Sequence, residues 1–211
     1  MNSKENRGKL IAIIGIDGSG KSTIVSKLAD TNIVENTIAI SDGDNPVLLH
    51  EMYSACKKLG ISRGEYFSDE FRHYLYMGSC ILRTYNDIVP LLEKGTNVVL
   101  DRYSVCLKIF TKLYTKSTYH CLANILNCLP TPDLGIYLDI DVDESLKRIE
   151  KRGSPQKFSL HENKEDLISK KNEYENLIPL ESYKVVKIDA NRSAEDVFSD
   201  VLSEINNVII L

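Results

Sequence analysis

The nine residues GIDGSGKST at positions 15–23 constrain this chain more than any other stretch of its sequence. They directly follow the apolar run LIAII, and their spacing is G-x-x-x-x-G-K-S. Glycines let the backbone curl so that several N–H groups face one anion, and a helix that begins there points its positive end at the same anion. The stretch therefore predicts a phosphate-binding loop (P-loop) between a buried strand and a helix.

Two side chains of this loop have specific expected partners. Lys21 should reach the β- and γ-phosphates of a nucleoside triphosphate, and the Ser22 hydroxyl should hold Mg²⁺. The residues expected to contact the nucleotide are Gly15, Asp17, Gly18, Ser19, Gly20, Lys21, Ser22 and Thr23. The chain is therefore expected to bind a nucleoside triphosphate, although a P-loop alone does not define a reaction.

Short apolar runs alternate with amphipathic stretches along the chain. The runs predict strands because they are nearly unbroken, as is typical of strands covered on both faces, and they lie at 10–15, 37–41, 97–101, 134–140 and 183–189. Helices are expected at 20–30, 46–59, about 66–94, about 103–128, 142–152 and 193–209. This alternation predicts an α/β fold, a doubly wound five-stranded parallel sheet with helices on both faces. A length of 211 residues suits one domain with a small lid.

The composition argues against several classes of protein. The formal net charge of −4 argues against a non-specific nucleic-acid binder, which is usually basic. No apolar run approaches the roughly 18 residues of a membrane span, so no membrane partner is expected. The five cysteines include no C-x-x-C pair, which favours reduced thiols in a cytoplasmic protein over disulfides or a zinc cluster.

A second group of polar residues, DRY at 101–103, ends the third predicted strand. The end of this strand should lie beside the P-loop. Asp101 could then orient Mg²⁺ or its waters, and Arg102 could clamp an acceptor phosphate through two hydrogen bonds. The structural alternative is a helix cap followed by a surface arginine, and the presence of the P-loop favours the functional interpretation.

The most loop-like internal stretch is RGSPQKFSLHEN at 152–163, between two helical stretches. It is a candidate lid, and Arg152 and Lys157 are its candidate catalytic cations. Cations that close over a transferring phosphoryl group offset the charge on its oxygens. The alternative is a solvated basic helix end, where lysine and arginine suit the helix dipole, and we favour that alternative for Lys151.

Together these motifs resemble those of the thymidylate kinase family. The resemblance rests on GIDGSGKST, on DRY, on PDLGIYLDIDVDESLKRIEKRG at 132–153 and on IDANRSAEDV at 188–197. It implies the fold of a P-loop nucleoside monophosphate kinase over residues 1–211, with a lid at about 152–163. It also implies ATP with Mg²⁺ as the donor, a nucleoside monophosphate as the acceptor (dTMP, converted to dTDP) and usually a homodimer.

The resemblance also implies roles for single residues. Lys21 and Ser22 match the phosphate and magnesium positions, and Arg102 matches the arginine that grips the acceptor phosphate. Asp17 matches a carboxylate that approaches the sugar hydroxyl of the acceptor. Lys157 stands where the family has a lid arginine, and a lysine offers one point charge in place of a planar fork.

The acceptor side departs from the family. Counting back from a proline, the positions of an arginine and a glutamine that hold the acceptor and read thymine are Cys80 and Leu82. Arg83 or Arg72 could substitute for the missing arginine. Because lost hydrogen-bond partners would leave a base unpaired, these departures raise the hypothesis of an acceptor other than dTMP.

Other acceptor contacts are expected on the same side of the site. Asp42, in SDGDNP after the second strand, could approach a sugar or an amine, although the favoured alternative is that it caps the following helix. Phe71 and Tyr74 are candidates for stacking on the acceptor base, although aromatic residues at helical spacing more often belong to the core.

Two alternative functions stay open on the sequence alone. The first is a kinase for a nucleoside or another small hydroxyl compound, in which Asp17, Asp42 or Asp101 would serve as a base. The second is a P-loop protein that binds nucleotide without transferring phosphate, which the weakened lid would allow.

Overall fold

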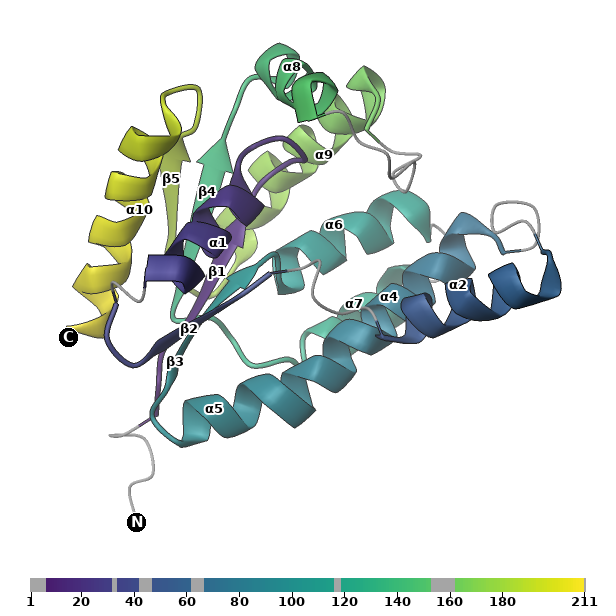
Figure 1. The fold of residues 1–211 in the computed structure, drawn as a ribbon, viewed down its shortest axis with the longest axis horizontal. Coiled ribbons are helices and arrows are strands. Elements are labelled where there is room, and N and C mark those ends of the chain that lie inside the picture. Colours follow the sequence, from purple (N-terminus) through teal and green to yellow (C-terminus); the bar gives the residue numbers. More distant parts are fainter. Residues whose placement is uncertain are drawn as a thin grey trace.

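The computed structural model describes residues 7–31, 34–41, 47–61, 67–115, 119–152 and 162–210. Five parallel strands form one sheet in the order β2-β3-β1-β4-β5 (Figure 1). The strands are β1 (Leu10–Ile14), β2 (Thr37–Ile40), β3 (Asn97–Asp101), β4 (Leu134–Asp139) and β5 (Val185–Asp189). All five lie within the predicted runs, and the fold is the predicted doubly wound α/β sheet.

The central strands β1 and β3 are buried along their whole length. Each of these strands is a nearly continuous run of apolar residues, because helices cover both faces of the sheet. In the parallel register of these two strands, Ile13 lies opposite Asp101. The end of β3 is therefore level with the start of the P-loop, which follows β1.

Helices cover the two faces of the sheet in the arrangement that right-handed crossovers require. On one side lie α1 (Lys21–Thr31) and α10 (Ala194–Ile209), and on the other lie α6 (Ser104–Tyr114) and α9 (Lys164–Leu177) (Figure 1). The predicted start of α10 is confirmed, because the side chain of Ser193 caps it by accepting a hydrogen bond from Asp196 N–H.

The helix predicted at about 66–94 is continuous but not uniform. Here α4 (Asp69–Arg83) passes into a π-helical segment, η2 (Thr84–Ile88), and then into α5 (Val89–Glu93). The Val89 N–H donates to the carbonyl of Thr84, five residues back. Pro90 accounts for this wider turn, because its ring has no N–H and would clash with the preceding turn of an α-helix.

The helix predicted at about 103–128 is instead two helices, α6 and α7 (Tyr119–Leu126). The α-helix ends at Thr115, whose φ of −127° and ψ of 49° are not helical. Threonine and serine are poor residues for a helix interior, and the sequence here reads TKST. Among the described residues, the remaining elements are α2 (Val47–Leu59), α8 (Val142–Arg152) and a short 3₁₀ turn, η3 (Ile178–Leu180).

Two predicted site residues, Asp42 and Lys157, lie outside the described residues, as does the predicted lid from 153 to 161. The helices α8 and α9 flank that segment. Within the described ranges, the helices are too short or too polar to cross a membrane.

Candidate active site

The P-loop joins β1 to α1, and three of its positions require glycine. Gly15, Gly18 and Gly20 have φ values of 149°, 77° and 97°, a region that side chains with a Cβ rarely adopt. At Gly18 the reason is also steric, because a Cβ there would lie 2.7 Å from the carbonyl oxygen of Ser145 on α8. The loop is therefore packed directly against α8.

Two buried hydroxyl groups hold the loop from outside. Tyr174 of α9 is fully buried and donates to the Gly15 carbonyl at 3.0 Å, while Ser145 donates to the Asp17 carbonyl at 2.5 Å. The Sγ atom of Cys106 lies 3.0 Å from the Tyr174 hydroxyl. These contacts fix the backbone of the loop before any phosphate binds.

Lys21 lies at the start of α1 and is only 4% exposed. Its ammonium group donates to the Ile16 carbonyl at 2.8 Å and lies 3.4 Å from the Ser19 hydroxyl. Burial and, after it, the positive charge of Arg102 lower the pKa of Lys21 to about 8. A bound phosphate would supply negative charge that raises this pKa again.

Ser22 and Asp101 meet across the ends of α1 and β3. The Ser22 hydroxyl donates to Asp101 Oδ2 at 2.5 Å. The other oxygen, Oδ1, is buried and makes no hydrogen bond to any residue that the structure describes. A buried carboxylate oxygen beside a hydroxyl fits Mg²⁺ or one of its waters, because Mg²⁺ takes few protein ligands when phosphates and water complete its shell.

Arg102 follows directly in the chain and has a left-handed backbone, with φ of 67°. This conformation costs a non-glycine residue of order 1–3 kcal/mol and is common at functional sites. The Arg102 N–H donates to the Ile13 carbonyl at 2.9 Å, which ties the turn to β1. The guanidinium group pairs through NH2 with Oδ1 of Asp17 in the P-loop.

Asp17 therefore lies between two cations. Its second oxygen, Oδ2, accepts a hydrogen bond from Lys170 of α9 at 2.5 Å. Burial alone would raise the pKa of Asp17. The charges of Arg102, Lys170 and Lys21 outweigh that effect and hold the pKa well below its usual range. The carboxylate is ionised, and both of its oxygens are engaged.

A hollow opens beside Arg102, between α4 and the ends of β2 and β3. The described residues that line it are Ile40, Tyr76, Cys80, Arg83, Thr84, Ile88, Leu100, Asp101, Arg102, Tyr103 and Leu107. Arg83 is fixed there by a hydrogen bond from NH1 to the Ser41 carbonyl at 3.2 Å. Of the two arginines that could replace the missing one, Arg83 therefore shares a hollow with Arg102.

The predicted stacking residues do not line this hollow. Phe71 is 41% exposed and stacks on Phe67, with ring centroids 5.3 Å apart. The Tyr74 hydroxyl donates to Glu70 at 2.5 Å. Arg72 is also absent from the described lining. The aromatic residue of α4 that does line it is Tyr76, whereas the sequence analysis favoured Phe71 and Tyr74.

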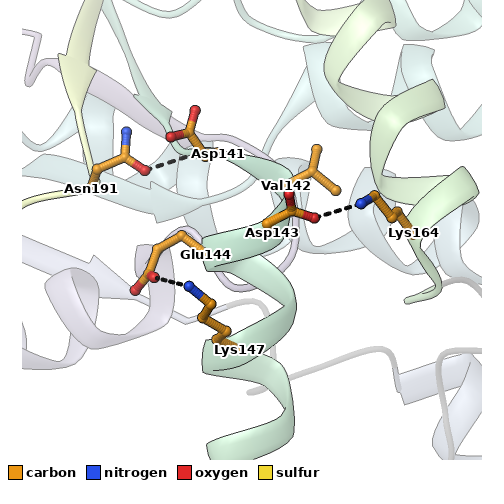
Figure 2. Close-up of a pocket in the computed structure, with 7 residues that line it drawn as sticks. All are labelled: Asp141, Val142, Asp143, Glu144, Lys147, Lys164 and Asn191. Carbon is orange, nitrogen blue, oxygen red and sulfur yellow. Dashed lines mark hydrogen bonds and ion pairs between the residues drawn. The ribbon is translucent and has the colours of Figure 1, made fainter.

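A larger hollow, of about 550 Å³, lies at the amino end of α8, away from these residues. It is lined by Asp141, Val142, Asp143, Glu144, Lys147, Lys164 and Asn191, drawn in Figure 2. Both lysines face carboxylates: Lys164 lies 2.7 Å from Asp143, and Lys147 lies 3.8 Å from Glu144 (Figure 2). Three carboxylates make this hollow a poor site for phosphate.

A model of the thymidylate kinase family matches residues 13–201. The chain belongs to this family. The thymidylate kinase of Francisella tularensis subsp. novicida is 31% identical over 205 residues, which cover 90% of this chain and 92% of that protein. The thymidylate kinase of Schizosaccharomyces pombe is 27% identical over 210 residues, covering 99% of this chain and 96% of that protein. As a member of the family, the chain is a nucleoside monophosphate kinase.

Solved structures share the fold at low sequence identity. Thymidylate kinase from Candida albicans superposes with a TM-score of 0.66 and 21% identity, covering 95% of this chain and 92% of that one. Deoxyadenosine kinase from M. mycoides gives a TM-score of 0.65 and 20% identity, covering 94% of this chain and all of that one.

Two departures from the thymidylate kinase pattern can now be placed. Cys80 lines the hollow beside Arg102, whereas Leu82 is 46% exposed and is not in the described lining. The first departure therefore changes the wall of the hollow.

Arg152, a predicted lid cation, lies at the end of α8. Its NH2 pairs with Glu162 at 3.1 Å, across the ends of the predicted lid, and its side chain is 56% exposed. A catalytic role for Arg152 stays a prediction.

The residue that sequence reasoning missed most completely is Lys170. On a helix that reads KEDLISKKNEYENL, a lysine is expected to face water. No local signal distinguishes it from Lys171, its neighbour.

Proposed function

We propose that this chain transfers the γ-phosphoryl group of ATP to the phosphate of a nucleoside monophosphate, with dTMP as the first candidate. The observation that carries the proposal is that Lys21 and Arg102, which follow different strands, both bind the P-loop: Lys21 donates to the Ile16 carbonyl, and Arg102 pairs with Asp17. One cation suits the donor phosphates and the other suits the acceptor phosphate.

On the donor side, the P-loop residues from Gly15 to Thr23 would cradle the phosphates of ATP. Ser22 and Asp101 would hold Mg²⁺ between them, one through its hydroxyl and the other through its buried oxygen. When bound, Mg²⁺ neutralises charge on the phosphate oxygens.

On the acceptor side, the hollow beside Arg102, whose volume is only about 40 Å³ in this structure, would receive the phosphate end of the monophosphate. Arg102 would bind its phosphate, and Arg83 would supply a second positive charge from the neighbouring wall. Tyr76 and Cys80 would face the base or the sugar. The wall at Cys80 can offer only a weak hydrogen bond, so it would leave a base edge without a strong partner.

Little proton chemistry is needed for this reaction. The attacking oxygen of a monophosphate is already anionic, so positioning and charge do most of the work. We also propose that the lid brings Arg152 and Lys157 to the transferring group, and that closure excludes water.

A nucleoside kinase would need a base. Asp17 suits that role poorly, because both of its oxygens are held by cations and its pKa is well below the usual range. This observation argues against Asp17 as the base of a nucleoside kinase.

The experiment is ADP release from ATP with Mg²⁺, measured against a panel of nucleosides and their monophosphates, with Lys21→Ala as the inactive control. Turnover of dTMP that is lost in Lys21→Ala supports the proposal. Preference for another monophosphate would place the change of acceptor at the wall around Cys80. ATP binding without ADP production on any acceptor would favour a non-catalytic role.

Arg83 and Arg72 form a matched pair for the acceptor side. Arg83→Gln should raise the KM for the acceptor about tenfold, since a charge-assisted hydrogen bond to phosphate is lost. Arg72→Gln should raise it less. A larger effect at Arg72 would overturn the assignment of Arg83.

We further propose a cytoplasmic homodimer. The four cysteines whose state the structure describes are free thiols, which suits a reducing compartment. Light scattering coupled to size exclusion would measure the mass of the particle, and the mass of a monomer would contradict the homodimer.

A further inference from the structure

Lys170 is a buried cation that the proposed reaction does not yet use. It lies on α9, beyond the predicted lid, and is 3% exposed. Burying an ammonium group is costly unless an opposite charge meets it. Its partner is Asp17 Oδ2, at 2.5 Å, so α9 reaches directly into the P-loop.

Lys170 and Arg102 share Asp17 between them. Arg102 reaches Oδ1 through NH2, and Lys170 takes Oδ2. An arginine facing a lone carboxylate tends to form a two-point fork that uses both oxygens. Because Lys170 holds one oxygen, the contact between Arg102 and Asp17 is limited to a single oxygen.

The same two cations also share an aromatic ring. The Phe110 centroid lies 5.3 Å from Cζ of Arg102 and 5.5 Å from Nζ of Lys170. His73 of α4 packs edge-on against this ring, with centroids 6.5 Å apart and planes at 82°. A cation over an aromatic face gains energy that depends on its position, so the ring restricts where each cation can lie.

These contacts suggest what Lys170 does for Arg102. With Lys170 present, the guanidinium group lies beside Asp17 without enclosing both of its oxygens. With Lys170 removed, Arg102 could close a fork on the free oxygen, and its charge and its donors would turn toward Asp17 and away from an incoming phosphate.

We propose that Lys170 is a positioning residue, which occupies the second oxygen of Asp17 so that Arg102 stays oriented for the acceptor phosphate. This inference rests on the proposed function, in which Arg102 binds that phosphate. It assigns the residue an effect on acceptor binding, whereas a purely structural role would affect the stability of the loop and leave acceptor binding unchanged.

The test uses the whole chain with Lys170→Met and, as matched control, Lys112→Met. Lys112 also links α6 to α9, through Glu173 at 2.6 Å, but it is 40% exposed and its ion pair does not involve Asp17. The KM and kcat for dTMP are measured with saturating ATP, together with the KM for ATP. The affinity for dTMP alone is measured by calorimetry.

Lys170→Met should raise the KM for dTMP, and weaken its binding, by about tenfold or more, because a charge-assisted contact to phosphate is misdirected. The KM for ATP should change much less. Lys112→Met should leave both constants near those of the wild type. An unchanged KM for dTMP in Lys170→Met would overturn the proposal. If kcat and thermal stability both fell while the KM for dTMP stayed the same, Lys170 would have a structural role only.

A second variant separates charge from packing. In Lys170→Met with Asp17→Asn, the carboxylate that would capture Arg102 is gone. Because Asp17 is itself an expected acceptor contact, the reference is Asp17→Asn alone, and adding Lys170→Met to it should weaken acceptor binding no further. A further loss as large as in the wild-type background would show that Lys170 does not act through Asp17 and Arg102.

The two proposals can fail separately. If the wild type binds dTMP but transfers nothing, the proposed function fails, and the calorimetry of Lys170→Met still decides the role of Lys170. If the wild type transfers phosphate and Lys170→Met binds dTMP normally, only the Lys170 proposal fails. A wild type that binds no monophosphate in the panel overturns both.

Discussion

Lys21 loses its proton at a lower pH than an ordinary lysine, and this makes nucleotide binding sensitive to pH above neutrality. With a pKa of about 8 in the folded chain and 10.5 as reference, Lys21 loses its proton as the pH rises through 8. Between pH 8 and 10.5 the unfolded chain binds more protons at Lys21 than the folded chain does. The free energy of unfolding therefore rises with pH across this window, because the folded protein no longer buries a charge at Lys21.

The affinity for ATP should therefore fall about tenfold between roughly pH 7 and roughly pH 9, following the loss of the Lys21 proton. Lys21→Arg keeps its charge and should show a much flatter profile. Dissociation constants measured by a fluorescent ATP analogue across this range provide the check. Equal slopes in the wild type and Lys21→Arg would exclude Lys21 as the titrating group.

Gly18 combines a left-handed backbone with close packing against α8. Gly18→Ala should lower the free energy of unfolding by more than about 2 kcal/mol and abolish ATP binding, since strain and a clash with Ser145 add together.

The matched control for Gly18 is Gly60, at the end of α2. It has a φ of 67° with open space around its Cβ position. Gly60→Ala should cost only about 1 kcal/mol. Urea unfolding of the two variants tests the difference, and similar losses would mean that the contact with α8 is not tight.

At the scale of elements, the packing of α4 on α6 contains a buried histidine. His73 Nε2 lies 2.9 Å from the Thr111 hydroxyl, and burial lowers its pKa to about 4. The unfolded chain binds the proton near 6.5, so stability falls as the pH drops from 6.5 to 4.

His73 should account for up to about 3 kcal/mol of that loss. His73→Gln, which can keep a hydrogen bond to Thr111, should lose less stability on acidification. Urea unfolding at several values of pH compares the two proteins. Parallel pH profiles would assign the acid sensitivity to other groups.

The helix α9 contributes more to the site than its sequence indicates. It supplies Tyr174 to the P-loop carbonyl and Lys170 to Asp17, and it follows the predicted lid. Any movement of α9 would therefore reach the P-loop through these two hydrogen bonds.

At the scale of the whole molecule, ligand binding should stabilise the fold. ATP with Mg²⁺ at about 100 times its dissociation constant should add about 2.7 kcal/mol to the free energy of unfolding. Removing Mg²⁺ with a chelator should reduce this gain, and Asp101→Asn should show the reduced gain even with Mg²⁺ present. Thermal unfolding with and without chelator measures it. A normal response in Asp101→Asn would contradict a role for Asp101 in holding the metal.

The sequence by itself determined the sheet, the P-loop and the position of DRY. These features depend on short apolar runs and on local backbone demands, such as the positive φ at Gly15 and Gly18. Parallel pairing of β1 with β3 then brings Ser22 to Asp101, as the order of motifs predicted. The site was predictable to this extent because each motif directly follows a strand.

Only the tertiary structure decided which side chains of the helices face the site. The sequence did not show that Tyr76, and not Phe71 or Tyr74, faces the hollow, or that Arg83 does so and Arg72 does not. It also did not predict the π-helical segment before Pro90, which shifts the helical register between α4 and α5. Lys170 reads as a surface lysine and is buried because Asp17, 153 residues earlier, lies opposite it. Residues three or four apart in the sequence share a face of a helix, whichever face is chosen. Which of these faces is buried depends on contacts with residues that are distant in the chain.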